Sequence, residues 1–161
     1  MQELTPQDVL QVLDTYDFDF TILEFNESTA TSEQAAEAIG CQVAQIAKSI
    51  CFMIKNGDPV LVVASGVNTV DDRKMADLLN VGRKRVRMAK PDQCIEVFGY
   101  PPGGVPPIAH RTPGLAIYLD ESLRQYERIY AAAGSSNINF GMTCEQLELM
   151  TNGIWADVAK A

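Results

Sequence analysis

Two apolar runs, residues 50–54 and 60–64, lie on either side of Asn56-Gly57. This dipeptide is strongly favoured in two-residue hairpin turns, because both of its residues tolerate positive φ angles. Since both runs are apolar at nearly every position, we expect neighbouring structure to cover both faces of the hairpin. The pattern therefore predicts a buried hairpin at the centre of a sheet.

Short helical and strand patterns follow one another along the rest of the chain. Capping residues and apolar spacing predict helices that begin at Thr5-Pro6, at residues 31–34, near residue 70, at Pro91 and at residues 143–146. Further strands are expected at residues 20–25, 86–88, 115–120 and 128–134. The mixture predicts an α+β fold built on a mixed sheet rather than a regular alternation of strand and helix.

The composition is that of a globular protein, with 47% hydrophobic and 21% charged residues among 161. We expect one domain over residues 1–161. No apolar run is long enough to span a bilayer and the first residues do not resemble a signal peptide, so a cytoplasmic protein with no membrane partner is expected. The four cysteines are widely spaced and favour reduced, structural thiols.

The charge is unevenly distributed. A net charge of −8 argues against DNA as a partner, because non-specific binding requires many phosphates to be neutralised. A local basic segment nevertheless occurs at residues 83–90, with Arg83, Lys84, Arg85 and Arg87. It could contact a nucleic-acid backbone, or it could be a solvated strand face with Val86 and Met88 pointing inward.

One stretch, residues 96–114, holds five of the eight prolines, four of the eleven glycines and the single histidine, His110. Proline and glycine together disfavour both helix and central strand, so this segment is predicted to be a shaped loop. Adjacent glycines at Gly103 and Gly104 could expose amide groups that hold a developing oxyanion. The alternative is a rigid surface connection without a chemical role.

Several reaction classes are disfavoured by the residues available. Any Ser–His or Cys–His arrangement would depend on His110, and the candidate nucleophile would be Cys144 at a helix start. No spacing suggests a metal site, and no phosphate-binding or dinucleotide motif is present, so no cofactor is expected. Lys48 begins an otherwise apolar strand, where its ammonium must reach water or find an anionic partner.

Four segments together resemble the YbaK/prolyl-tRNA-editing-domain family of aminoacyl-tRNA deacylases. They are residues 28–54, 63–79, 99–110 and 129–151, in the family's order. The resemblance implies an α+β domain with a curved, partly barrel-like mixed sheet flanked by short helices. It also implies a cofactor-free hydrolase that releases an amino acid from a mischarged tRNA.

The resemblance also implies site residues. Lys48 would bind the 3′ end of tRNA. We hypothesise that amides around Gly103 and Gly104 polarise the ester carbonyl, and that the neighbouring ribose hydroxyl of the substrate helps to orient the water. The remaining pocket wall would comprise Phe25, Gly99, Tyr100, Pro107, His110, Gly134 and Ser135.

Three positions depart from the family pattern. Ala109 stands where many relatives have glycine, and Phe25 and Ala132 differ from the cysteine-specific branch. These departures bear on whether cysteine is the substrate side chain. We expect a trans-editing enzyme for a small amino acid on tRNA, with tRNAPro as first choice and a synthetase as candidate partner. The alternative is a catalytically silent module that binds tRNA ends or a synthetase.

Overall fold

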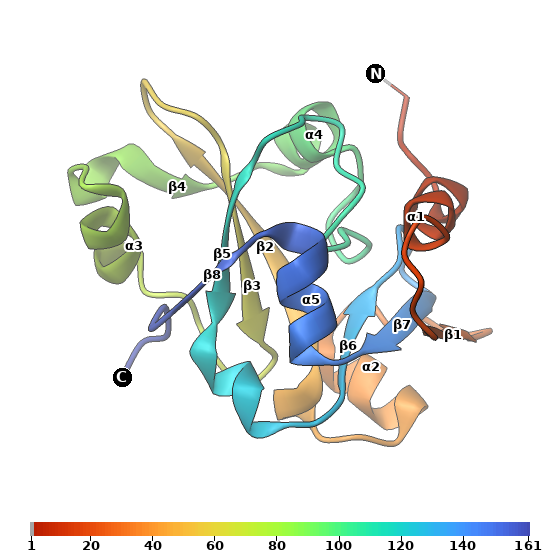
Figure 1. The fold of residues 1–161 in the computed structure, drawn as a ribbon. Helices are drawn as coiled ribbons and strands as arrows, with labels where there is room; N and C mark the ends of the chain where they lie inside the picture. Colours follow the sequence, from red (N-terminus) through yellow and green to blue (C-terminus); the bar gives the residue numbers. More distant parts are fainter. Residues whose placement is uncertain (1) are drawn as a thin grey trace.

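Two β-sheets form the framework of the computed structural model, which describes residues 2–161 (Figure 1). A five-stranded mixed sheet has the order β4-β2-β3-β5-β8, and a three-stranded antiparallel sheet has the order β1-β7-β6. A parallel bridge between Ile46 and Tyr130 joins them. The strands are β1 (Thr21–Glu24), β2 (Ala47–Ile54), β3 (Val60–Ser65), β4 (Val86–Met88), β5 (Ala116–Asp120), β6 (Ile129–Ala132), β7 (Ile138–Met142) and β8 (Ile154–Ala156).

The predicted hairpin lies at the centre of the larger sheet. Strands β2 and β3 pair antiparallel across a turn in which Asn56 has φ of 58°. Every residue of β3 is buried, because β2 and β5 flank it and side chains cover both of its faces. The predicted buried hairpin is confirmed, but its turn is not the two-residue type: Gly57 does not have a positive φ, and its amide donates to the Ile54 carbonyl over 3.0 Å.

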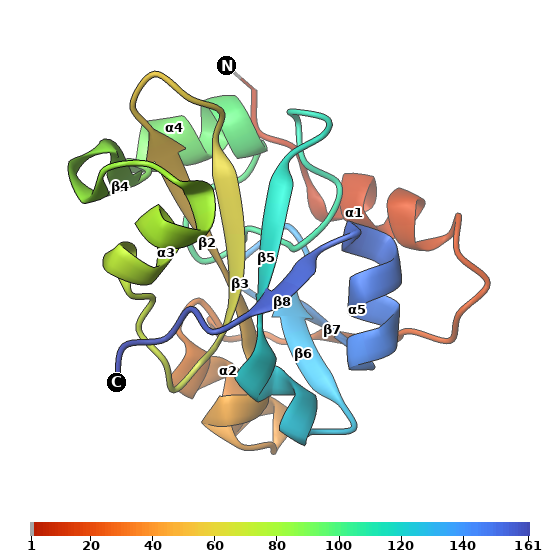
Figure 2. The same cartoon turned by 60° about the vertical axis from the view of Figure 1, so that its left-hand side comes forward.

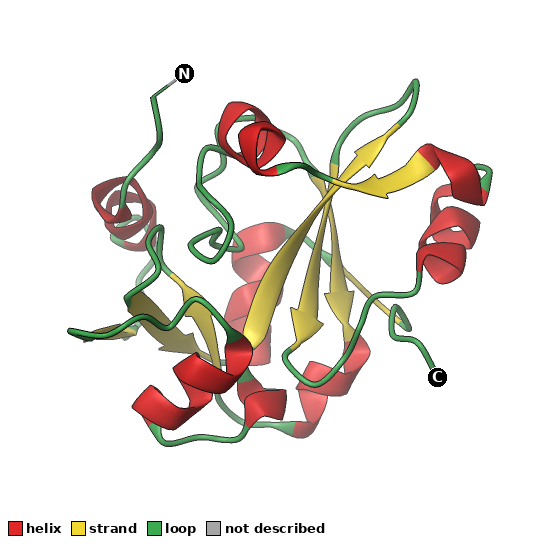
Figure 3. Ribbon diagram, turned by 180° about the vertical axis from the view of Figure 1, so that it is seen from behind, coloured by secondary structure: helices red, strands yellow, loops and turns green. Residues whose placement is uncertain are grey.

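Short helices pack around these sheets, as Figures 2 and 3 show from two further directions. Threonine side chains cap α2 and α5, while Asp71 caps α3, which begins two residues later than the pattern suggested. Gly40 ends α2 with φ of 85°, as a left-handed C-terminal residue should. The helices are α1 (Pro6–Leu13), α2 (Ser32–Ile39), α3 (Asp72–Leu79), α4 (Pro91–Gln93, continued by a π-helical turn at Cys94–Phe98) and α5 (Cys144–Thr151).

The predicted α+β class and mixed sheet are confirmed, and the two sheets meet without closing into a complete barrel. Sequence reasoning missed β7 and β8. Within residues 2–161, the segment from Gly99 to Leu115 contains neither helix nor strand, so the predicted loop is also confirmed. No helix among these residues has the length and apolar character needed to cross a membrane.

Charge is segregated along this fold. Residues 1–47 contain nine Asp or Glu residues and no Lys or Arg, so their net charge is −9, whereas the whole chain has a net charge of −8. They form α1, β1 and α2, whereas the basic segment lies at β4 and the turn before it, at the other side of the molecule in Figure 1. A polyanion would therefore meet repulsion on one side and attraction on the other.

Candidate active site

A cavity of about 290 Å³ opens where the two sheets meet. The start of β2, the first turn of α2, the end of β3, the Gly103 loop and strands β6 and β7 contribute to its wall. Small or apolar side chains provide much of this wall, among them Ala30, Ala47, Val105 and Ala132. The space suits a compact side chain.

Lys48 lines this cavity from the second position of β2, where it pairs with Ala64 of β3. Its ammonium forms no ion pair or hydrogen bond with any other of residues 2–161. The rigid hairpin thus presents a lysine whose charge is available to an anionic ligand.

Two buried polar residues form part of the wall opposite β2. Asn139 of β7 is 3% exposed, and its amide Nδ2 donates to Thr29 Oγ1 over 2.7 Å. The Thr29 hydroxyl donates in turn to the carbonyl of Ser136 over 3.2 Å. Because a buried polar group without a partner is costly, this chain of bonds fixes the wall.

Ser49 of β2 also borders the cavity, but its hydroxyl points away from the accessible space. Its Oγ is buried and has no hydrogen-bond partner among residues 2–161. Leaving a buried hydroxyl unpaired costs about 1–3 kcal/mol. Such a group is unusual in a well-packed core.

Glycine at position 66 keeps the first turn of α2 close to β3. The Gly66 amide donates to the Ile46 carbonyl over 2.8 Å. A Cβ atom at this position would collide with the carbonyl oxygen of Val43 and lie 2.8 Å from Ser32 Cβ. Only glycine therefore allows α2 to form this side of the cavity.

The two adjacent glycines of the loop have different surroundings. Gly103 lines the cavity with φ of 88°, and its amide donates no hydrogen bond to any of residues 2–161. The Gly104 amide instead donates to the Pro101 carbonyl over 3.1 Å. The expectation that both amides are available is therefore corrected: the Gly104 amide is used within the loop.

Gly104 has a structural role together with Gly134 and Ser135. The Gly134 amide donates to the Gly104 carbonyl over 3.0 Å, and a Cβ atom on Gly104 would lie 2.9 Å from Ser135 Cα. The Ser135 hydroxyl donates to Asn137 Oδ1 over 2.8 Å. These contacts attach the loop to the β6–β7 turn, and the cavity wall does not include the three residues.

Gly99 and Tyr100, at the start of the loop, hold it through hydrogen bonds. Gly99 ends the π-helical turn with φ of 102°, and its carbonyl accepts from the Leu4 amide over 2.7 Å. Tyr100 is fully buried, and its hydroxyl donates to the Ala109 carbonyl over 2.7 Å. Burial raises the pKa of Tyr100 above its usual value, so the phenol stays neutral. Ala109 has φ of 63°, a left-handed conformation that favours glycine, the residue that many relatives have at this position.

His110 and Pro107 line a different cavity, of about 530 Å³, together with the end of α5. The imidazole Nε2 of His110 donates to the Pro106 carbonyl over 2.7 Å. Burial lowers the pKa of His110, so the ring is neutral near pH 7. The structure does not bring these two residues to the Lys48 cavity.

Phe25 and Cys144 also lie outside the Lys48 cavity. The Phe25 backbone pairs with Asn137 through two hydrogen bonds, of 2.9 and 3.0 Å. The Cys144 thiol donates to the Leu123 carbonyl over 3.3 Å, and burial raises its pKa. Because Cys144 and His110 line separate hollows, the geometry does not favour a cysteine-dependent esterase.

The basic segment consists of two kinds of residue. Arg83 pairs with Asp72 over 3.1 Å, and the Arg85 guanidinium donates to the carbonyls of Lys55 and Asn56. Lys84 and Arg87 are exposed and form no ion pair among residues 2–161.

The burial of Val86 and Met88 tests the alternative in which the basic segment is a solvated strand face. Val86 is buried as expected, but Met88 is 67% exposed, so the idea that both point inward is wrong. Arg87 pairs with Met53, five residues after Lys48 on β2, which is about 17 Å along the strand.

Sequence reasoning did not single out Glu33, Thr29, Ser49 or Asn139 as wall residues. They are common polar residues within the matching segments, and no motif distinguishes them from solvated positions. Only the meeting of α2, β2 and β7 brings them together.

The family profile named aminoacyl-tRNA editing domain matches residues 26–149. The chain belongs to this family. A relative from Bacillus subtilis, the uncharacterized protein YwhH, is 35% identical over 86% of this chain and 87% of its own length. Another, EbsC from Enterococcus faecalis, is provisionally assigned as a Cys-tRNA(Pro)/Cys-tRNA(Cys) deacylase. It is 28% identical over 83% of this chain and 80% of its own length.

A solved editing-domain structure agrees with this placement. It is the crystal structure of a protein provisionally assigned as a trans-editing enzyme for prolyl tRNA synthetase. The two chains superimpose with a TM-score of 0.88 and 35% identity over 97% of each chain. The predicted family, its fold and the enzyme class of aminoacyl-tRNA deacylase are confirmed.

Proposed function

We propose that this editing domain acts in trans on a mischarged tRNA, with tRNAPro as the first candidate, and removes a small amino acid. The supporting observation is the cavity of about 290 Å³, in which one unpaired lysine stands beside small apolar side chains. The apolar side chains of the wall distinguish substrates by only about 1–3 kcal/mol per methylene, so exclusion by size is the expected filter.

The proposed reaction is hydrolysis of the ester between the amino acid and the terminal ribose. Lys48 binds the phosphate of the terminal nucleotide, and the Gly103 amide donates to the ester carbonyl oxygen as negative charge develops there. Water adds to the carbonyl carbon while the neighbouring ribose hydroxyl orients it. The bond to the ribose oxygen then breaks, and that oxygen takes the proton from water.

This scheme needs no histidine or cysteine nucleophile, which is consistent with the position of His110 and Cys144 outside the cavity. Aminoacyl esters are already reactive, so positioning and oxyanion stabilisation supply the necessary acceleration. Phe25, Gly99, Tyr100, Gly104, Pro107, His110, Gly134 and Ser135 keep a supporting role in the proposal, as residues around the wall rather than within it.

The test is release of labelled amino acid from tRNAPro and other tRNAs charged with Cys, Ala, Ser, Thr or Pro. We expect release of one or two small amino acids from a mischarged tRNA and none from Pro-tRNAPro. A panel left fully charged would contradict the proposal and favour the alternative, a silent module that binds tRNA ends.

A prolyl-tRNA synthetase is the proposed protein partner. Support comes from the structural relative assigned as a trans-editing enzyme for that synthetase. We expect the synthetase to increase deacylation of a mischarged tRNA in the same assay. An identical rate with and without it would argue against this partner.

The exposed cations Arg87 of β4 and Lys84 of the turn before it are proposed to contact the acceptor stem. About 17 Å of strand separates Arg87 from Lys48, a gap that the single-stranded 3′ end of the tRNA would cross. Charge reversal by Lys84→Glu and Arg87→Glu should weaken tRNA binding and reduce the salt dependence, by about one unit of log–log slope per lost phosphate contact. Binding titrations at several salt concentrations measure both.

Arg83 and Arg85 provide the comparison for this prediction. Their guanidinium groups are engaged with Asp72 and with the turn after β2, so Arg83→Gln is expected to change the salt slope less than Arg87→Gln. Equal slopes for wild type and the Lys84/Arg87 variant would remove β4 from the proposed interface.

A further inference from the structure

The Lys48 cavity contains charges of both signs. Among the described residues that line it, Lys48 is the one basic residue and Glu33 the one acidic residue. Lys48 comes from β2 and Glu33 from the first turn of α2. Neither takes part in an ion pair within residues 2–161. The cavity therefore offers a free cation and a free anion to the same ligand.

The aminoacylated end of a tRNA carries the matching charges. A phosphate lies on one side of the ribose, and the α-amino group of the esterified amino acid lies on the other. An α-amino group has a pKa of about 7.7–8.0, so it is largely protonated near pH 7. With the phosphate at Lys48, the ammonium remains as the group that needs an anionic partner.

We propose that Glu33 binds the α-ammonium group of the amino acid that is removed, an inference that rests on the proposed function. The carboxylate would receive a charge-assisted hydrogen bond from the substrate. The proposal makes a free amino group a requirement for tight binding. Peptidyl-tRNA and other N-acylated aminoacyl-tRNAs, which lack that cation, would escape hydrolysis.

A capping box holds the backbone around Glu33 in place. The Thr31 hydroxyl accepts from the Gln34 amide over 3.1 Å, and Gln34 Oε1 accepts from the Thr31 amide over 3.2 Å. These two bonds form a capping box around the turn that contains Glu33. They fix the backbone position of Glu33 at the first turn of α2, from which its exposed side chain extends.

The test uses two stable analogues in which an amide replaces the ester. Both carry alanine on the 3′-amino group of 3′-amino-3′-deoxyadenosine 5′-phosphate, one with a free α-amino group and one N-acetylated. Calorimetric titration of the wild-type protein should show about tenfold tighter binding of the free amine. In Glu33→Gln, which keeps the size of the side chain, the preference should fall to nearly one.

Glu37→Gln is the matched control, because Glu37 lies four residues later on α2 and borders a separate hollow with Glu27 and Ser28. It should keep the tenfold preference. If the wild type binds both analogues equally, or Glu33→Gln retains the preference, the proposal for Glu33 is overturned. A preference that depends on Glu33, in a protein that releases no amino acid from any tRNA, would instead overturn the proposed function.

Discussion

Replacing Lys48 with alanine should lower kcat/KM for a mischarged tRNA by about 10- to 100-fold. A hydrogen bond to a charged group contributes about 1.5–3 kcal/mol, and each 1.4 kcal/mol corresponds to a factor of ten. The ammonium has no partner among residues 2–161, so its removal leaves no unpaired group in the protein. Single-turnover deacylation at several enzyme concentrations would measure the loss.

The distribution of this loss tests the anchoring role. If Lys48 holds the terminal phosphate equally in the ground and transition states, the effect appears mainly as weaker binding, with a smaller change in the maximal rate. Lys160→Ala is the control, because this substitution removes the same charge at a position near the C-terminal end and outside the cavity. Unchanged turnover in Lys48→Ala, or an equal loss in Lys160→Ala, would contradict the role.

The elements that sequence reasoning found have strong local signals. Two apolar runs around a turn signal identify the central hairpin, and threonine caps identify the starts of α2 and α5, because these caps act through bonds to their own neighbours. Strand β7 was missed because Asn137, Asn139 and Gly141 are residue types that are uncommon in strands. Asn139 is buried there by tertiary contacts that no local pattern encodes.

The site was only partly predictable for the same reason. Lys48 could be found because a cation at the start of an apolar strand is locally anomalous. Glu33 could not, because an acid in the first turn of a helix is an ordinary helix-stabilising residue. The glycine pair shows the limit of a motif: the sequence treats Gly103 and Gly104 alike, whereas the fold engages only the Gly104 amide.

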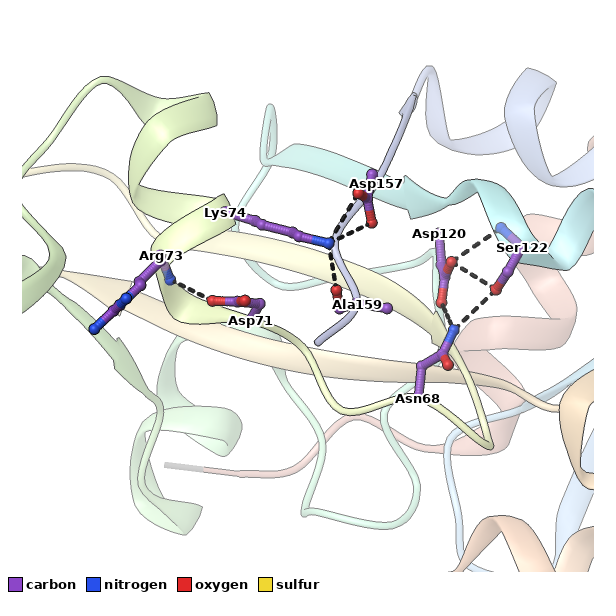
Figure 4. Close-up of polar contacts among 8 residues, drawn as sticks. All are labelled: Asn68, Asp71, Arg73, Lys74, Asp120, Ser122, Asp157 and Ala159. Carbon is purple, nitrogen blue, oxygen red and sulfur yellow. Dashed lines mark hydrogen bonds and ion pairs between the residues drawn. The ribbon is translucent and has the colours of Figure 1, made fainter. Parts of the chain in front are cut away.

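Replacing Asp120 with alanine should reduce the free energy of unfolding by about 3–5 kcal/mol. Asp120 is 2% exposed at the end of β5, and Figure 4 shows its carboxylate between Asn68 and Ser122. One oxygen accepts from the Ser65 amide and Asn68 Nδ2, and the other from the Ser122 amide and hydroxyl. Its removal leaves several buried donors without an acceptor, each costing about 1–3 kcal/mol, offset by relaxation and water entry. Urea unfolding would measure the loss.

Asp157 supplies the control on the same face of the molecule. It pairs with Lys74 over 2.8 Å but its side chain is 61% exposed, so Asp157→Ala should cost less than about 1 kcal/mol. Comparable losses in the two variants would show that the Asp120 bonds add little. Such a result would also show that Asp120 does not stabilise the turn from Ser65 to Asn68. This turn contains Gly66, which lines the cavity.

The pH dependence of this difference gives a second measurement. Burial acts to raise the pKa of Asp120, but the bonds from Asn68, Ser65 and Ser122 outweigh it and hold the pKa below its usual value. A carboxyl whose pKa is lower in the folded state stabilises the protein above its unfolded pKa of about 3.9. That contribution is lost as the pH falls through the folded pKa. The stability difference between wild type and Asp120→Ala should therefore be constant near neutral pH and shrink below about pH 4, because protonation removes the charge that the four donors stabilise.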